Sequence, residues 1–133
     1  MYEPAPLRDG NDGRVREVFA HEATIVMEEP GDVRAPGAAV TLALCGSWEH
    51  EPPCPLAPHH TSADRRGDRL HVRVLFATAP EAEDDVRRRI DAALARGTLE
   101  GPDGTTTRWR LVHTAPTHLT AEEQPHAERL RHA

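Results

Sequence analysis

Residues 70–97 read LHVRVLFATAPEAEDDVRRRIDAALARG, and this stretch decides the fold class. From Leu70 to Thr78 apolar and polar side chains alternate, which is typical of a β-strand with one buried face. The pattern then changes to the spacing of an amphipathic helix, with apolar residues at Val86, Ile90, Ala93 and Leu94. A strand followed directly by such a helix predicts a domain that combines a sheet with a covering helix.

Both ends of this helix carry recognisable signals. Thr78 and Glu81 have the spacing of a capping box, in which each side chain binds the backbone of the other residue. Gly97 is placed to end the helix in a left-handed conformation. The charged residues between these ends are interpreted as an outer face of ion pairs, formed by Glu83, Asp84, Asp85, Arg87, Arg88 and Arg89.

Two strands are expected before this stretch. Residues 18–28 alternate with period two, and His21 is in phase with the apolar side chains. A second strand is expected over residues 39–48, paired antiparallel with the first because the connection is short. Residues 49–69 contain four prolines and no sustained period, so we expect one long loop, of a length that is usually functional or disordered.

A fourth strand is expected over residues 106–113, followed by a tail with a weak capping signature from Thr120 to Glu123. The predicted fold is therefore α+β, a small antiparallel sheet in the order β-β-β-α-β with one face covered by a helix. The long loop lies between the second and third strands. We expect a flexible segment over residues 1–13, a single domain over 14–118, and a C-terminal tail or short helix over 119–133.

The composition limits the core and the partners. Leu, Ile, Val and Phe together account for 24 of the 133 residues, so the core is thin and a homodimer interface or a bound metal would help to stabilise it. The net charge of −6 and the few aromatic residues argue against a nucleic-acid surface. No apolar stretch is long enough to span a membrane, and no secretory signal is visible, so we expect a cytoplasmic protein. All 16 basic residues are Arg, which points to a GC-rich bacterial genome.

The chemistry is concentrated in residues 45–60, CGSWEHEPPCPLAPHH. The whole chain has two Cys and nine His residues, and this segment holds both Cys and three of the His. Thiolate and imidazole together are the ligands of zinc, and they also suit copper and iron. The prolines stiffen the segment and reduce the entropy lost when it wraps an ion. We therefore predict a transition-metal site, with zinc as the preferred ion, built from Cys45, His50, Cys54 and one of His59 and His60.

The familiar zinc signatures do not fit this segment. Eight residues separate the two cysteines instead of two, and no His-Glu-x-x-His occurs. The deaminase signature needs a second Cys where Ala57 stands. A haem-responsive Cys54-Pro55 pair is a less favoured interpretation. The alternatives left open are a buried Cys45 that acts as a small apolar residue, a solvated loop, and a disulfide between the two cysteines.

Other residues are candidates for supporting roles. His21 is interpreted first as a core or interface histidine that could also reach the site, and His71 as a fifth ligand or second-shell partner. His113 is a further candidate for the second shell, and His118 could also join it. Glu49 and Glu51 flank His50 and are the candidate catalytic residues, as a general base or as groups that orient the histidine. Two functions result: a small metalloprotein, which could be a metal-dependent enzyme, or a dimeric binding or accessory domain whose loop recognises a small ligand or protein partner.

Overall fold

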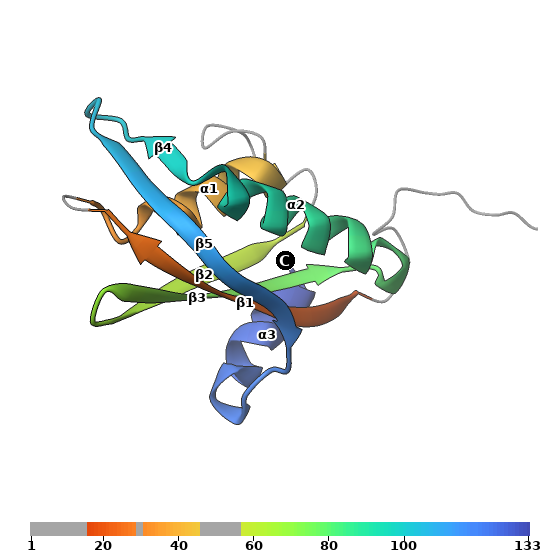
Figure 1. Cartoon of the computed structure of the whole chain (residues 1–133). Coiled ribbons are helices and arrows are strands. Elements are labelled where there is room, and N and C mark those ends of the chain that lie inside the picture. The colour runs from red at the N-terminus through yellow and green to blue at the C-terminus, as the bar shows by residue number, and fades with distance from the viewer. Residues whose placement is uncertain (1–15, 29–30, 46–56) are drawn as a thin grey trace, which may run out of the picture.

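The computed structural model describes residues 16–28, 31–45 and 57–133 (Figure 1). The five strands are β1 Glu17–Met27, β2 His59–Arg66, β3 Arg69–Thr78, β4 Thr98–Glu100 and β5 Thr106–Thr117. The three α-helices are α1 Ala35–Cys45, α2 Glu83–Arg96 and α3 Gln124–Arg131, and the 3-10 turns Pro80–Ala82 and Ala121–Glu123 precede the last two.

The strands form one curved sheet in the order β2-β3-β1-β5-β4, with every neighbouring pair antiparallel. The long central strand β1 pairs with β3 on one side and with β5 on the other. Without β4 and α3, the sequence β1-α1-β2-β3-α2-β5 with this strand order is the ferredoxin-like β-α-β-β-α-β arrangement. The predicted α+β class, with an antiparallel sheet covered by helix, is confirmed.

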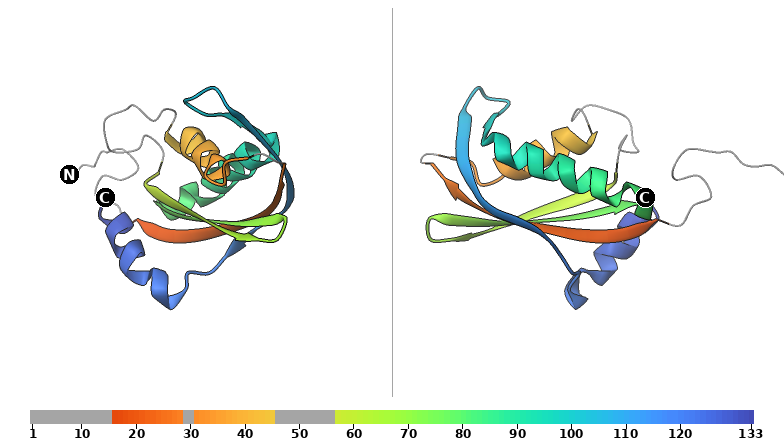
Figure 2. Two further views of the ribbon diagram at one scale, coloured as in Figure 1. Left: turned by 90° about the vertical axis from the view of Figure 1, so that its left-hand side faces the viewer. Right: turned by 45° about the vertical axis from the view of Figure 1, so that its right-hand side comes forward.

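Helices α1 and α2 lie side by side on one face of the sheet (Figure 2). Between them and the sheet is the main core, whose largest fully buried side chains include Phe76, Ile25, Leu44, Leu70, Ile90 and Leu94. The predicted helical stripe is confirmed, since all four of its apolar residues are buried. Each large aliphatic or aromatic side chain in this core contributes about 1.5–3 kcal/mol.

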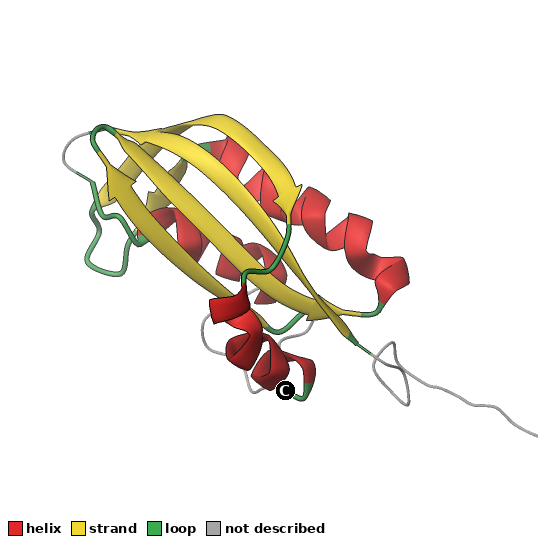
Figure 3. Cartoon of the chain, turned by 90° about the horizontal axis from the view of Figure 1, so that it is seen from below, coloured by secondary structure: helices red, strands yellow, loops and turns green. Residues whose placement is uncertain are grey.

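Helix α3 lies on the opposite face of the sheet, near one end (Figure 3). A second apolar cluster fixes it there, formed by Val18, Ala20, Leu75, Ala77, Ala127 and Leu130. The capping box predicted for Thr120 and Glu123 is present. Part of the sheet face opposite α1 and α2 is thus covered by the chain itself, and the expected homodimer stays a prediction.

The prediction of a strand over residues 39–48 is wrong, because residues 35–45 form helix α1. All eleven residues are uncharged, and a short apolar run fits both a strand and a buried helix. Ala and Leu favour the helix, and Pro36 suits its first turn. A Cβ at Gly37 would lie 2.7 Å from Thr61 Oγ1, so this glycine allows α1 to approach β2 closely.

Two further expectations are corrected. The loop expected over residues 49–69 ends earlier, because residues 59–66 form β2 and Gly67 turns the chain into β3 with φ of 65°. Strand β2 lies at the edge of the sheet with mostly exposed polar side chains, so no apolar alternation marks it. The capping box expected at Thr78 is also absent: this buried residue ends β3, and Ala79 stands at the cap without a side-chain bond.

No helix in the described ranges combines the length and the apolar character needed to cross a membrane.

Candidate functional site

The predicted metal-binding segment runs from the end of α1 to the start of β2. Cys45 is the last residue of α1, and His59 is the first residue of β2. Four other predicted site residues lie outside the described residues: His50, Cys54, Glu49 and Glu51. The structure therefore describes the two ends of the segment.

His59 is held between α1 and the loop that leads into β2. Its Nδ1–H donates to the Ala57 carbonyl oxygen at 3.1 Å, and its Nε2 accepts from the Thr41 hydroxyl at 3.0 Å. A carbonyl can only accept, so these partners place the proton on Nδ1 and the lone pair on Nε2. Burial lowers the pKa of His59, against the opposing effect of the bond to Ala57. The side chain is therefore a neutral imidazole that presents Nε2 toward α1.

The side chain of His60 points to the other face of the sheet, the face on which α3 lies. Its ring packs against that of His126 on α3, with the centroids 4.1 Å apart. Burial lowers the pKa of His60, and the nearby His126, His59 and Arg129 act in the same direction. Neighbouring residues of a strand point to opposite faces, so the structure does not bring the His59 and His60 rings together. Of the two predicted alternatives, only His59 faces the helix that ends at Cys45.

The histidines predicted for the second shell are spread over the sheet. His71 and His113 flank Thr24 in the register of β3, β1 and β5, and His71 Nε2 bonds to Thr24 Oγ1 at 3.2 Å. This row lies on the same face as α3, away from the His59 ring. The carbonyl of His118 accepts from Arg73 at 3.0 Å. The structure therefore does not gather His71 or His113 around His59.

His21 belongs to a separate polar network between β1, α2 and β5. Its side chain faces α2 and the residue is only 1% exposed. Nε2–H donates to Asp91 Oδ1 at 2.8 Å, and Nδ1 accepts from Arg87 Nη1 at 2.8 Å. The Thr114 hydroxyl donates to the same Asp91 oxygen at 2.8 Å and lies 2.9 Å from Nε2. Burial lowers the pKa of His21, and the bond to Asp91 opposes this shift.

This network resembles a catalytic triad in composition but not in arrangement. In a Ser-His-Asp triad the carboxylate holds Nδ1 and the hydroxyl faces an unprotonated Nε2. Here the carboxylate and the hydroxyl share one nitrogen, and the other nitrogen accepts from Arg87, whose guanidinium also lies 5.3 Å from the Phe76 ring. The imidazole is thus fully engaged and closed to solvent, and the network ties α2 to the sheet.

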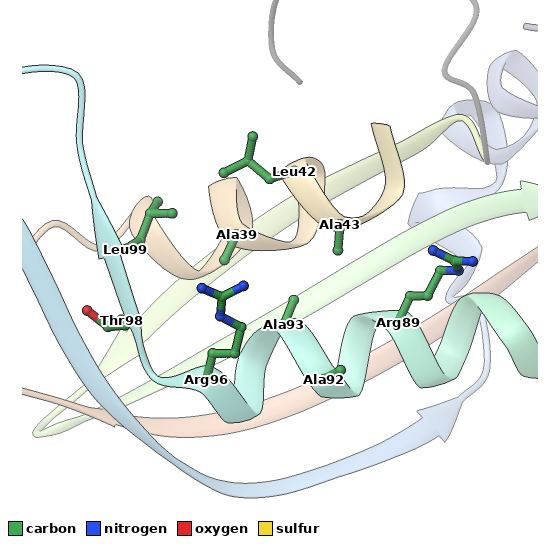
Figure 4. Close-up of a pocket in the computed structure, with 9 residues that line it drawn as sticks. All are labelled: Ala39, Leu42, Ala43, Arg89, Ala92, Ala93, Arg96, Thr98 and Leu99. Carbon is green, nitrogen blue, oxygen red and sulfur yellow. The ribbon is translucent and has the colours of Figure 1, made fainter. Parts of the chain in front are cut away.

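A shallow groove lies on the outer side of the helical layer, between α1, α2 and β4 (Figure 4). Its volume is about 350 Å³, and its walls are mainly small apolar side chains, including Ala39, Ala43, Ala93 and Leu99. Arg89 and Arg96 lie on the same face of α2, about two turns apart, and both extend toward α1 (Figure 4). Arg89 pairs with Asp85 at 3.1 Å, whereas Arg96 has no ion pair within the described residues.

The described side chains alone do not complete a metal site. Within the described part of the chain, no three His, Cys, Asp or Glu side chains are grouped so that they could hold a metal ion. The structure supplies one oriented imidazole, that of His59, at the end of the segment. For Cys45 only the backbone position at the end of α1 is described. The predicted ligands His50 and Cys54 lie outside the described ranges.

The comparisons with known proteins assign no family. No family model matches the chain, and no curated protein matches it. Among solved structures, the chain matches part of the periplasmic protease PqqL from Escherichia coli weakly, with a TM-score of 0.36 and 13% identity over 63% of this chain. The chain spans 10% of the length of that protease.

Proposed function

We propose that the protein binds a transition metal, with zinc as the preferred ion, through Cys45, His50, Cys54 and His59. The observation that carries this proposal is the orientation of His59, whose Nδ1–H is held by the Ala57 carbonyl. Metal-binding histidines commonly use one ring nitrogen for the ion and donate the other N–H to a carbonyl or carboxylate. Such a bond fixes the tautomer, so Nε2 is the nitrogen that would coordinate the metal.

The lowered pKa of His59 supports the same role. A protonated imidazole has no lone pair for a metal, so a proton competes with the ion for the ligand. Burial keeps His59 neutral. The Thr41 hydroxyl that donates to Nε2 would have to turn away when a metal binds, which costs a single neutral hydrogen bond of about 0.5–1.5 kcal/mol.

The fold also brings the two ends of the segment together. Thr41 lies one helical turn before Cys45, and its contact with His59 joins the end of α1 to the start of β2. The packing of α1 on the sheet therefore already holds the two ends of the segment in place, which lowers the entropic cost of bringing its ligands together. The prolines of the segment further reduce the entropy that metal binding would cost.

Whether such a site is catalytic depends on its coordination. Four protein ligands are typical of a structural or storage site, whereas three ligands and a water are typical of a zinc enzyme. Glu49 and Glu51 are our proposed general bases in the second case, because each is a neighbour of His50 in the sequence.

The test is a zinc titration of the untagged protein against a chromogenic chelator. We expect one tight site in the native chain and a loss of affinity of about tenfold or more in Cys54→Ser and in His59→Gln. Thr41→Val is the matched control, since it removes the hydroxyl bound to Nε2 but no ligand, and should leave zinc affinity unchanged or higher. Equal affinity in native protein, Cys54→Ser and His59→Gln would refute the proposal.

A second candidate function is the binding of a small amphipathic carboxylate in the groove between α1 and α2. The favouring observation is Arg96, a guanidinium at an apolar groove with no acidic partner within the described residues. An aliphatic chain would lie on the alanines, and its carboxylate would accept from Arg96. Titration with decanoate should show binding that is lost in Arg96→Gln and kept in Arg88→Gln, an exposed arginine outside the groove.

A further inference from the structure

The imidazoles of His60 and His126 meet across two elements that are far apart in the sequence. His60 projects from edge strand β2, and His126 lies in the first turns of α3. Their ring centroids are 4.1 Å apart with an interplanar angle of 45°, so the rings are in direct contact. Both side chains retain access to solvent, since His60 is exposed and His126 is half-buried.

The surroundings hold both rings in place. The apolar cluster that contains Ala127 and Leu130 fixes the helix against the sheet. Glu123, one turn before His126, accepts two hydrogen bonds of 2.8 Å from Arg73 of β3. The register of the sheet fixes His60 opposite Leu75, a member of the same cluster. The contact between the rings therefore follows from the packing of two ordered elements.

Two imidazoles on a fixed scaffold are a chelating pair for late first-row divalent metals. With bonds of about 2.0–2.1 Å, two nitrogens on one tetrahedral zinc lie roughly 3.4 Å apart. The two rings are already neighbours, with centroids 4.1 Å apart, and they would have to swing apart by side-chain rotation for one nitrogen of each to face the same ion. Water can complete the coordination, because the pair is open to solvent.

The nearby charges act in opposite directions. The carboxylate of Glu123 favours positive charge at His60, and the guanidinium of Arg129 opposes it. Since Glu123 is already bonded to Arg73, it supplies negative charge near the ion without being needed as a ligand.

We propose that His60 and His126 form a divalent-metal site that joins β2 to α3. This site shares no residue with the proposed Cys45–His59 site, and it lies on the face of the sheet opposite to the His59 ring. An ion held there would link β2 to α3, which packs mainly on β3 and β1, and it would stabilise the C-terminal helix.

The test is a Zn²⁺ titration of the full chain carrying Cys45→Ser and Cys54→Ser, followed by NMR of the histidine rings. We expect saturable shifts at His60 and His126, together with slower hydrogen exchange in α3. His60→Gln and His126→Gln should each weaken binding by about tenfold or more. His113→Gln, an exposed histidine on the same face, should not change it.

A second arm keeps the test decisive if the serine variants fold poorly. The native protein is first loaded with one equivalent of Zn²⁺, and only the second equivalent is followed. Unchanged affinity in both His60→Gln and His126→Gln, or shifts confined to other histidines, would overturn the proposal. Failure of the Cys45–His59 site would appear separately, as the absence of a cysteine-dependent first equivalent.

Discussion

The imidazole of His21 is enclosed by side chains from two other elements, and each ring nitrogen has a defined partner. Burial lowers its pKa from the ordinary value of 6.5, although Asp91 favours the charged form. The unfolded chain therefore takes up a proton at His21 at a higher pH than the folded chain does. As the pH falls below about 6.5, this difference favours unfolding. The stability that the neutral His21 imidazole contributes to the fold is therefore present at neutral pH and lost on acidification.

We predict that His21→Gln reduces the dependence of stability on pH. Urea unfolding of the native protein should show a free energy that falls between about pH 7.5 and about pH 5.5, and the fall should be smaller in His21→Gln. Some dependence should remain, because burial also lowers the pKa of His59 and of His60. The exposed His113→Gln should behave like the native protein, and an identical fall in His21→Gln would contradict the assignment.

At this scale the sequence is informative about single positions but not about their partners. The alternation of residues 18–28 correctly places His21 on the apolar face. Its partners Arg87, Asp91 and Thr114 are 66 to 93 residues away, and no local pattern connects them. Arg87 forms the predicted pair with Glu83, yet its guanidinium also turns inward to His21 and the Ala20 carbonyl. A charged run on a helix does not reveal which member points to the core.

At the scale of elements, the end of α2 depends on Gly97. This residue has φ of 72°, and a Cβ there would lie 2.6 Å from the Trp109 carbonyl oxygen. The tight approach allows β5 to pass directly beside the end of the helix, where Trp109 Nε1 donates to the Leu94 carbonyl.

We predict that Gly97→Ala lowers the free energy of unfolding by more than Gly67→Ala. Gly67 also has positive φ, at 65°, but a Cβ there would meet no atom within 4 Å. Its replacement should cost about 1 kcal/mol from the left-handed conformation alone, whereas Gly97→Ala adds a steric clash and should cost about 2–3 kcal/mol. Urea unfolding measures both, and equal losses would show that the clash is relieved.

The attachment of α3 depends on a pair that is largely shielded from water. The side chains of Arg73 and Glu123 are 24% and 20% exposed, and they form a two-bonded contact at 2.8 Å. We predict that a double-mutant cycle with Arg73→Met and Glu123→Gln gives a coupling energy of about 1–3 kcal/mol in urea unfolding. The exposed pair Arg66 and Asp64, treated in the same way, should give less than about 1 kcal/mol. Equal couplings would mean that α3 is held by its apolar cluster alone.

Secondary structure could be predicted where two signals agree. The amphipathic stripe, the acidic first turn and the glycine all indicate α2, and the structure confirms it. For α1 the signals conflict, because its uncharged run fits a strand or a helix and only packing on the sheet selects the helix. Strand β2 carries no apolar pattern because its side chains are mostly exposed, so the sequence offers no basis for finding it.

For the whole molecule, the fold places the Cys/His-rich segment between two fixed points. Cys45 ends a helix packed on the sheet, and His59 begins a strand of that sheet. From its residue content the sequence selects this segment as the candidate metal site, and that selection stays a prediction. The sequence could not predict that adjacent histidines face opposite sides, because that required recognising β2.

A metal bound at this segment should also stabilise the thin core. Binding to the folded state alone adds RT ln(1 + [L]/Kd), about 2.7 kcal/mol when the free ion is at 100 times Kd. We therefore predict that removal of metal with a chelator lowers the melting temperature, and that added zinc restores it. The effect should be clearly smaller in Cys54→Ser, which keeps only the proposed His60–His126 site, and an equal effect in that variant would place the stabilising ion elsewhere.

The proposed site of Cys45, His50, Cys54 and His59 is tested most directly by the metal content of the native protein, purified without a His tag and measured by elemental analysis. We predict about one transition-metal atom per chain, reduced to trace levels in Cys54→Ser and in His59→Gln and unchanged in His71→Gln. Protein without metal, or a content that is the same in all four forms, would contradict it.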